Sequence, residues 1–142
     1  MVEKVEFGSK EWLDLAERFL KELTQEAGEQ ANDADYPMCE LYYNAPPHLA
    51  IEGDRIAWHF RIKNKKVDFG IGEVDDIDMK VMGDYETLLQ ISRIEYDPAD
   101  LKRVGEILSE PMKSGKFTFK GDATKAPDFL RPLHNLLAKR LL

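Results

Sequence analysis

The chain has 142 residues, enough for one domain and few for two, because domains run about 100–200 residues. Its 43% hydrophobic and 10% aromatic content excludes intrinsic disorder, and its one cysteine, Cys39, excludes an internal disulfide. The net charge of −7 argues against a nucleic-acid-binding protein, because such proteins need a basic face. Since the sequence shows neither a membrane span nor a secretory signal, we expect one cytoplasmic domain over residues 1–142.

The positive charge is concentrated in two stretches, Arg55 to Lys66 and Lys113 to Arg140. Two interpretations are open. The lysines and arginines are scattered over a solvated surface, or the fold joins them into one patch. Such a patch would attract a lipid headgroup, coenzyme A or, transiently, an anionic membrane surface.

The first predicted element is an amphipathic helix that follows Ser9 and ends at Gly28. Ser9 is a good N-cap, and Gly28 suits the left-handed position that closes many helices. The segment Glu29 to Pro37 has no periodicity and is expected to be a loop. The apolar residues that recur at helical spacing are Trp12, Leu13, Ala16, Phe19, Leu20, Leu23 and Ala27.

A hairpin follows, predicted from strict alternation on both sides of the turn at residues 63–66. With that turn Phe60 faces Phe69, and Arg61 faces Asp68. The same register pairs Ile62 with Val67 and Trp58 with Ile71, so the apolar side chains share one face.

The remaining chain is divided by the same criteria into short strands and helices. The predicted strands are 38–43, 48–52 before a Gly53-Asp54 turn, 77–82 and 116–120. The predicted helices are a short one capped by Asp84, one from Asp97-Pro98 ended by Pro111 to Gly115, and one from about Asp128 to Leu142 with Pro132 in its first turn or at a kink. This order predicts an α+β fold, with helices on one face of a curved, mostly antiparallel sheet.

The candidate catalytic or metal-binding residues are few. Cys39 with a histidine could form a thiol nucleophile, but no local motif surrounds it. His48 and His59 would face each other across the Gly53-Asp54 turn, and Glu40 could add a third metal ligand. Their ordinary role is that of a solvent-facing polar pair. We therefore predict no catalytic residue, no metal site and no cofactor.

The segment from about Leu49 to Leu137 resembles the sterol-carrier-protein-like family. The most specific match is Ser114-Gly115-Lys116-Phe117-Thr118-Phe119-Lys120-Gly121-Asp122, similar to the family's strand before the final helix. Two further stretches are also similar, Ile51 to Gly70 around the hairpin and Asp78 to Leu89 around a strand and helix.

The resemblance implies a five-stranded sheet and an apolar tunnel beneath a C-terminal helix that acts as a lid. It also implies a non-enzymatic carrier of a fatty acid, fatty acyl-coenzyme A or sterol-like molecule. The lining residues carried over are Trp58, Phe60, Phe69, Met79, Val81, Phe117, Phe119, Leu133 and Leu137.

Two segments depart from the family pattern. Residues 92–112 form a longer link that would reshape the tunnel mouth, and the segment from Tyr42 and Tyr43 to His48 has no clear counterpart. Two other functions stay open. One is a module for homodimerisation or enzyme docking, using exposed Leu141 and Leu142; the other is a small enzyme for a lipophilic substrate, using His48, His59 or Cys39.

Overall fold

The computed structural model describes residues 3–95 and 101–142, and five strands form one sheet in the order β3-β2-β1-β4-β5. Only the β1–β4 pair is parallel; the other three pairs are antiparallel. The strands are β1 (Asp35–Tyr43), β2 (Ile56–Lys63), β3 (Lys66–Ile71), β4 (Met79–Asp84) and β5 (Phe117–Gly121).

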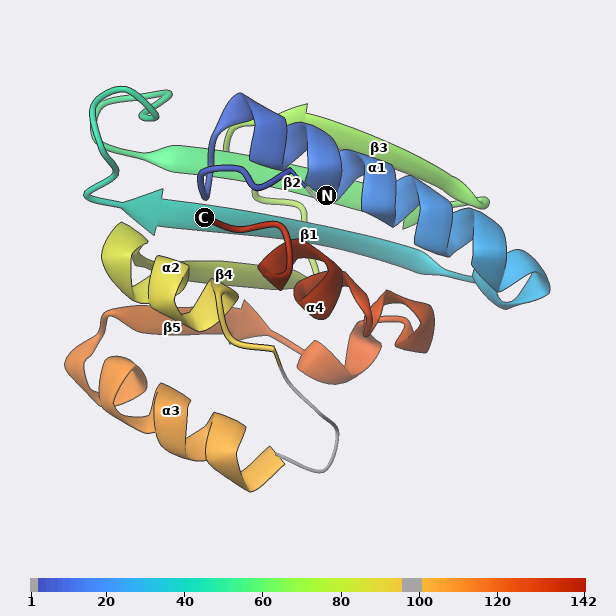
Figure 1. The fold of residues 1–142 in the computed structure, drawn as a ribbon. Coiled ribbons are helices and arrows are strands. Elements are labelled where there is room, and N and C mark those ends of the chain that lie inside the picture. Colours follow the sequence, from blue (N-terminus) through green and yellow to red (C-terminus); the bar gives the residue numbers. More distant parts are fainter. Residues whose placement is uncertain (1–2, 96–100) are drawn as a thin grey trace.

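Helices cover one face of this sheet (Figure 1). The helix α1 (Lys10–Ala27) crosses the β2–β3 side, and α4 (Leu133–Ala138) lies beside it over the middle of the sheet. The helix α2 (Tyr85–Ser92) lies in front of β4, and α3 (Leu101–Ser114) lies next to β5. The predicted α+β class and the mostly antiparallel five-stranded sheet are therefore confirmed.

The β2–β3 hairpin has the predicted register. Phe60 pairs with Phe69, Arg61 with Asp68, and Trp58 with Ile71. The turn itself contains only Asn64 and Lys65, both with positive φ, which is the geometry of a tight two-residue hairpin.

The start of the sheet differs from the prediction. A 3₁₀ turn occupies Gly28–Ala31, and β1 begins at Asp35 instead of residue 38. Pro37 lies in this strand although it lacks an N–H, and its carbonyl accepts a hydrogen bond from the amide of Asp78 (2.9 Å), the residue before β4. The predicted strand 48–52 is wrong: only one bridge, between Glu52 and Arg55, flanks the Gly53-Asp54 turn.

The predicted caps are confirmed. The Ser9 hydroxyl accepts a hydrogen bond from the amide of Trp12 (3.2 Å), and Gly28 at the other end of α1 has a φ of 58°. Asp84 caps α2 by accepting from the amide of Thr87 (3.4 Å).

The two later helices compare differently with their predicted limits. The proposed start of α3 at Asp97-Pro98 lies outside the described residues, and α3 ends at Ser114, within the predicted stretch Pro111 to Gly115. At the C-terminus, Pro132 cannot donate into a helix that begins upstream, so a 3₁₀ turn (Asp128–Leu130) precedes a six-residue α4. The expected helix over 128–142 is thus wrong in length.

The last residues also leave the helix. Val5 donates to the carbonyl of Arg140 (2.7 Å), and Leu142 donates to the carbonyl of Val5 (3.0 Å). Leu141 is consequently buried in the core, with 4% of its surface exposed, whereas Leu142 is 66% exposed. The expectation that both leucines are exposed therefore fails for Leu141.

Candidate functional site

A cavity of about 380 Å³ lies between the sheet and the helices, and most of its wall is apolar. On the sheet side it is lined by Tyr36, Met38, Glu40, Tyr42, Trp58, Phe60, Met79, Val81 and Phe117. The helical side and its connections supply Trp12, Leu88, Ile91, Ser92, Leu108, Ala126, Leu130, Arg131, Leu133, His134 and Leu137.

The strand pattern explains this lining. Successive side chains of a strand point to opposite faces, so alternate residues of β1, from Tyr36 to Tyr42, face the helices. Glu40 is the third of these four. Its cross-strand neighbours are Trp58 on β2 and Val81 on β4, so it sits in the middle of the cavity wall.

Seven of the nine residues predicted to line a tunnel line this cavity, and two do not: Phe69 and Phe119. Phe69 stacks on Trp58 with ring centroids 5.5 Å apart and lines a separate groove beside α1. Phe119 lies on the edge strand β5 and is 42% exposed. The segment predicted to reshape the tunnel mouth, residues 92–112, contributes Ser92, at the end of α2, and Leu108, from α3; Ile91 directly precedes the segment and also lines the cavity.

Glu40 is the acidic residue in the cavity wall, and a chain of hydrogen bonds holds it. The indole Nε1–H of Trp58 donates to the Tyr42 hydroxyl oxygen (2.9 Å), and that hydroxyl donates to Glu40 Oε1 (2.6 Å). Trp58 and Tyr42 are fully buried. The second carboxyl oxygen, Oε2, makes no hydrogen bond to any residue in the described part of the chain.

Burial shifts the titration of these groups. Loss of hydration raises the pKa of Glu40 to about 7, and the hydrogen bond from Tyr42 offsets only part of that effect. Burial, with the nearby Glu40 carboxyl as a second cause, raises the pKa of Tyr42 well above its usual value. The Glu40 carboxyl therefore changes charge near neutral pH.

Two nitrogen-bearing side chains, His134 and Trp12, also line the cavity. His134 Nε2 lies 2.7 Å from the carbonyl of Ile94, and burial lowers the pKa of this histidine. The buried indole Nε1–H of Trp12 has no hydrogen-bond acceptor within residues 3–95 and 101–142. A buried donor without a partner costs free energy.

Of the residues considered for thiol or metal chemistry, Cys39, His48 and His59 lie outside the cavity. His48 is not paired with His59; its ring binds Glu6 (2.9 Å) at the surface. His59 Nδ1 lies 2.9 Å from the carbonyl of Gly72, and its cross-strand neighbour is Cys39. Cys39 and His59 alternate with the cavity residues and so face the other side of the sheet. Glu40 and His59 lie on opposite faces of the sheet, and His48 binds Glu6 instead of Glu40.

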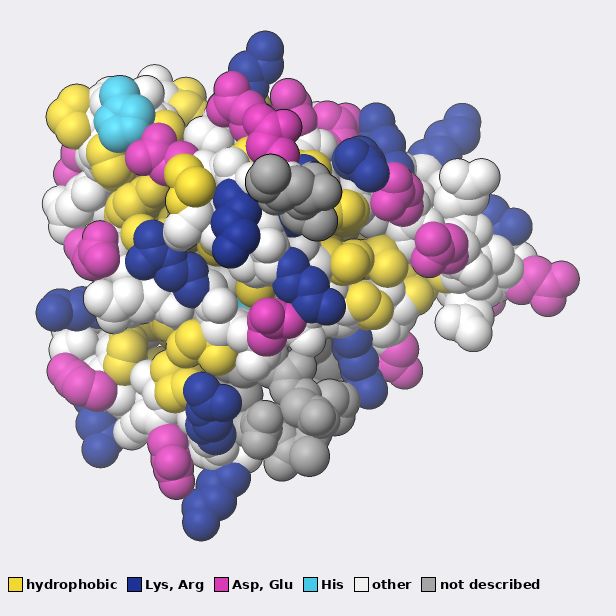
Figure 2. All heavy atoms as spheres, viewed as in Figure 1, with side chains coloured by type: hydrophobic (Ala, Val, Ile, Leu, Met, Phe, Trp, Pro, Cys, Tyr) yellow, Lys and Arg dark blue, Asp and Glu magenta, His cyan; other side chains and the backbone are white. Residues whose placement is uncertain are grey.

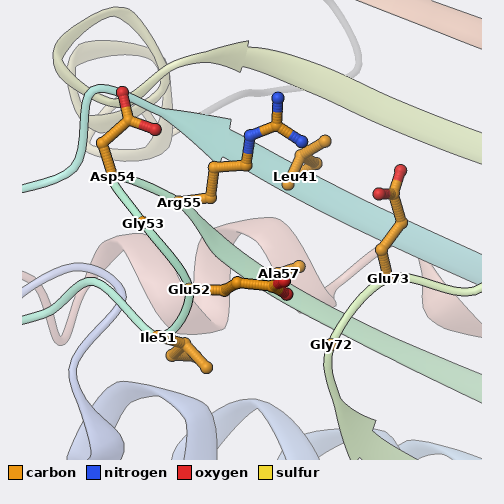
Figure 3. A pocket seen from close by; sticks show the side chains of 9 residues that line it. All are labelled: Leu41, Ile51, Glu52, Gly53, Asp54, Arg55, Ala57, Gly72 and Glu73. Carbon is orange, nitrogen blue, oxygen red and sulfur yellow. The ribbon is translucent and has the colours of Figure 1, made fainter.

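A second cavity, of about 300 Å³, lies on that other side (Figure 3). Leu41 and Ala57 form its floor, and the side chains of Arg55 and Glu73 stand on two sides of it. Arg55 lies over the Tyr43 ring, with its guanidinium carbon 5.2 Å from the ring centroid. Exposed charged residues dominate its rim, so it offers an apolar molecule little surface.

The basic residues do not gather into one patch. The first basic stretch lies on β2 and β3 at one edge of the sheet, and β5 within the second lies at the opposite edge. Figure 2 shows Lys and Arg side chains dispersed among acidic and uncharged ones on the helical face. Several are paired with carboxylates: Arg61 with Asp35, Lys125 with Asp78, Arg131 with Asp128 and Lys139 with Glu95. The scattered interpretation is the one found on this face.

None of the helices in the described residues combines the length and the apolar character needed to cross a membrane. No protein-family model matches the chain, and no curated protein matches it in sequence.

Solved structures do match, and they share the sterol carrier protein 2 fold. The sterol carrier protein domain 2 of Helicoverpa armigera superposes with a TM-score of 0.56 at 14% identity, over 96% of this chain and 93% of that one. Sterol carrier protein 2 of Yarrowia lipolytica, in its apo form, gives a TM-score of 0.52 at 16% identity, over 98% and 96%. A conserved hypothetical protein of Thermus thermophilus, described as possibly a sterol carrier protein, gives a TM-score of 0.51 at 14% identity, over 96% of this chain and 88% of that one. The fold implied by the resemblance is thus confirmed.

Proposed function

We propose that this protein is a non-catalytic carrier that holds one apolar, lipid-like molecule in the cavity between the sheet and the helices. The observation that carries the proposal is the cavity itself. Its volume of about 380 Å³ falls in the range of roughly 300–1,000 Å³ that small-molecule sites occupy. Each methylene placed there contributes ~0.8 kcal/mol, before the cost of immobilising the ligand.

The fold supports the same function. The Helicoverpa armigera and Yarrowia lipolytica proteins with this fold are sterol carrier proteins by name. In this chain α4 and the turn before it supply Leu130, Leu133 and Leu137 to the cavity, so we propose that this segment moves to admit the ligand.

The two other functions have less support. Leu141, on which the docking or dimerisation module rested, is buried within the same chain. Cys39, His48 and His59, on which the enzyme rested, do not line the cavity. We therefore propose binding without catalysis by these groups.

The test is binding of an uncharged apolar fluorophore, N-phenyl-1-naphthylamine, to the full chain. We expect saturable one-to-one binding that 1-decanol displaces. Val81→Trp fills the cavity from the sheet, and Leu133→Trp fills it from α4, so both variants should lose the site. The matched control is Thr118→Trp, because Thr118 is exposed and does not line the cavity.

Circular dichroism establishes that each variant is folded. Binding that survives both cavity variants, or that Thr118→Trp abolishes equally, would place the fluorophore elsewhere and contradict the proposal. Loss in Ile71→Trp alone would locate it in the groove beside α1, which Phe69 and Ile71 line.

A further inference from the structure

The cavity contains an acid where an apolar site has no need of one. Glu40 stands between Trp58 and Val81, and a hydrophobic residue at this position would extend the surrounding wall. An ionised carboxyl in such surroundings is costly unless hydrogen bonds surround it. Glu40 receives one described hydrogen bond, from Tyr42 to Oε1, and the other oxygen remains open to a ligand.

A donor without a partner lines the same cavity. Trp12 is 3% exposed, and its Nε1–H lacks an acceptor among the described residues. The Trp12 ring packs edge-to-face on Trp58, with centroids 5.6 Å apart, and Trp58 is the cross-strand neighbour of Glu40. An N–H over an aromatic ring is a weaker contact than an N–H donated to oxygen. The cavity wall thus contains one unused acceptor, Glu40 Oε2, and one residue, Trp12, whose buried N–H is an unused donor.

From this pair of groups we propose that the ligand is an apolar alcohol, whose hydroxyl hydrogen is donated to Glu40 Oε2 and whose oxygen accepts from Trp12 Nε1–H once the buried indole turns toward the cavity. This inference rests on the proposed carrier function and specifies the ligand's polar group. A hydroxyl is the smallest group that both donates and accepts. A carboxylate would only accept, and it would bring a second negative charge to Glu40. An ammonium group would only donate, leaving Trp12 unpaired.

The charged and titratable neighbours do not reverse this preference. Tyr36 and Tyr42, on β1, stay neutral at physiological pH because burial raises the pKa of each. His134, on α4, stays neutral because burial lowers its pKa. Arg131, just before α4, is the cationic residue of the lining, and it lies exposed with Asp128 at 3.1 Å. The lining residues of α1, α2, α3, β2, β4 and β5 carry no titratable side chain.

The experiment compares four ligands built on an unbranched ten-carbon chain with different polar groups: 1-decanol, decyl methyl ether, decanoate and decylamine. Each displaces N-phenyl-1-naphthylamine from the full chain at pH 8, where Glu40, with a pKa of about 7, is mostly ionised. We expect 1-decanol to bind about tenfold or more tightly than the ether and decanoate, as a hydrogen bond to a charged acceptor allows. On lowering the pH to 6, decanoate should gain about tenfold as Glu40 takes up a proton.

The variant Glu40→Gln keeps the shape of the side chain and removes its charge. It should bring decanoate to within about threefold of 1-decanol and abolish the pH effect. The control Glu26→Gln removes one carboxylate from an exposed position of α1 and should bind all four ligands as the wild type does.

Three results would overturn the inference while leaving the carrier function in place. They are equal affinities for 1-decanol and the ether at pH 8, tightest binding of decylamine, and tightest binding of decanoate that Arg131→Ala weakens. The last would place the polar group at Arg131 instead of Glu40. If no ten-carbon ligand displaces the fluorophore, the carrier function and the inference fail together.

Discussion

At the scale of single residues, the fold gives up stability at Glu40. Its carboxyl is desolvated among Trp58, Val81 and the other apolar walls, and the Tyr42 hydroxyl compensates only in part. The pKa of Glu40 is therefore about 7 in the folded protein against an ordinary value of 4.5. Residues whose pKa is strongly shifted by burial are often found in binding or active sites.

This shift predicts how stability depends on pH. Between about pH 4.5 and 7 the folded chain keeps the Glu40 proton while the unfolded chain has lost it, so stability falls as pH rises through that window. The total loss is about 3 kcal/mol, since one pKa unit corresponds to about 1.36 kcal/mol.

Urea unfolding of the wild type and Glu40→Gln at pH 4, 6 and 8 measures this pH-dependent loss of stability. From pH 4 to pH 8, the free energy of unfolding of Glu40→Gln should rise relative to that of the wild type by up to about 3 kcal/mol. A constant difference across this range would show that Glu40 titrates normally.

Residue-scale prediction from sequence succeeded where alternation was strict. The pattern of β2 and β3 places Trp58, Phe60 and Phe69 on one face, and the family resemblance, not the pattern, assigns them to a tunnel. Trp58 and Phe60 line the cavity, whereas Phe69 and Phe119 do not. Alternation predicts which face of the sheet a side chain lies on, but not whether a helix covers that part of the face. The same rule applied to Met38, Glu40 and Tyr42 puts Glu40 on the apolar face. Its acidic character suggested only a third ligand of a metal site, and that site was not the favoured interpretation.

At the scale of elements, β5 reaches β4 through close backbone contact at Gly121. Gly121 has a φ of 109°, and a Cβ there would overlap the carbonyl oxygen of Asp78. Gly121 pairs with Met79, the first residue of β4, and the same ladder brings Phe117 to the cavity wall. A glycine is required here for both conformational and steric reasons.

The variant Gly121→Ala should lose about 2 kcal/mol or more of the free energy of unfolding. Gly105→Ala is its control, because no neighbouring atom lies within 4 Å of a Cβ added to this residue of α3. In a helix interior alanine is better than glycine by about 1 kcal/mol, so the control should be slightly stabilised. Thermal unfolding compares the two; an equal effect of both substitutions would contradict the role given to Gly121.

The C-terminal element was the hardest to predict. The leucines from Leu133 onward fit helical spacing, but Pro132 delays the helix and the backbone contact with Val5 ends it. That contact joins residues at opposite ends of the chain, which no local pattern reveals. The same is true of the parallel β1–β4 pair, since a crossover connection separates its strands.

Leu141→Ala tests whether the C-terminus serves packing or association. Because Leu141 is buried in the core, truncation should cost about 2–4 kcal/mol of unfolding free energy. Leu142→Ala, at an exposed position, should change it by less than about 0.5 kcal/mol. Sedimentation should give the same mass for the wild type and both variants. If instead Leu141→Ala were as stable as the wild type but halved the mass, the dimerisation module would be favoured.

At the scale of the whole molecule, the cavity arises because the helical layer covers the sheet only in part. The sheet presents a continuous row of large side chains from β2 to β5, while the short helices α2 and α4 cover it with mostly aliphatic ones. Packing is tighter near the start of α1, where Phe7, Trp12, Tyr42 and Tyr85 form an aromatic cluster. The space therefore remains where the covering elements are shortest.

Native mass spectrometry of the full chain, purified without detergent alongside Val81→Trp, tests the central claim most directly. The wild type should carry one apolar molecule, seen as a mass adduct that is released on unfolding, and folded Val81→Trp should carry none. The bare mass for the wild type, with no adduct after incubation with 1-decanol, would contradict it. So would an identical adduct on both proteins.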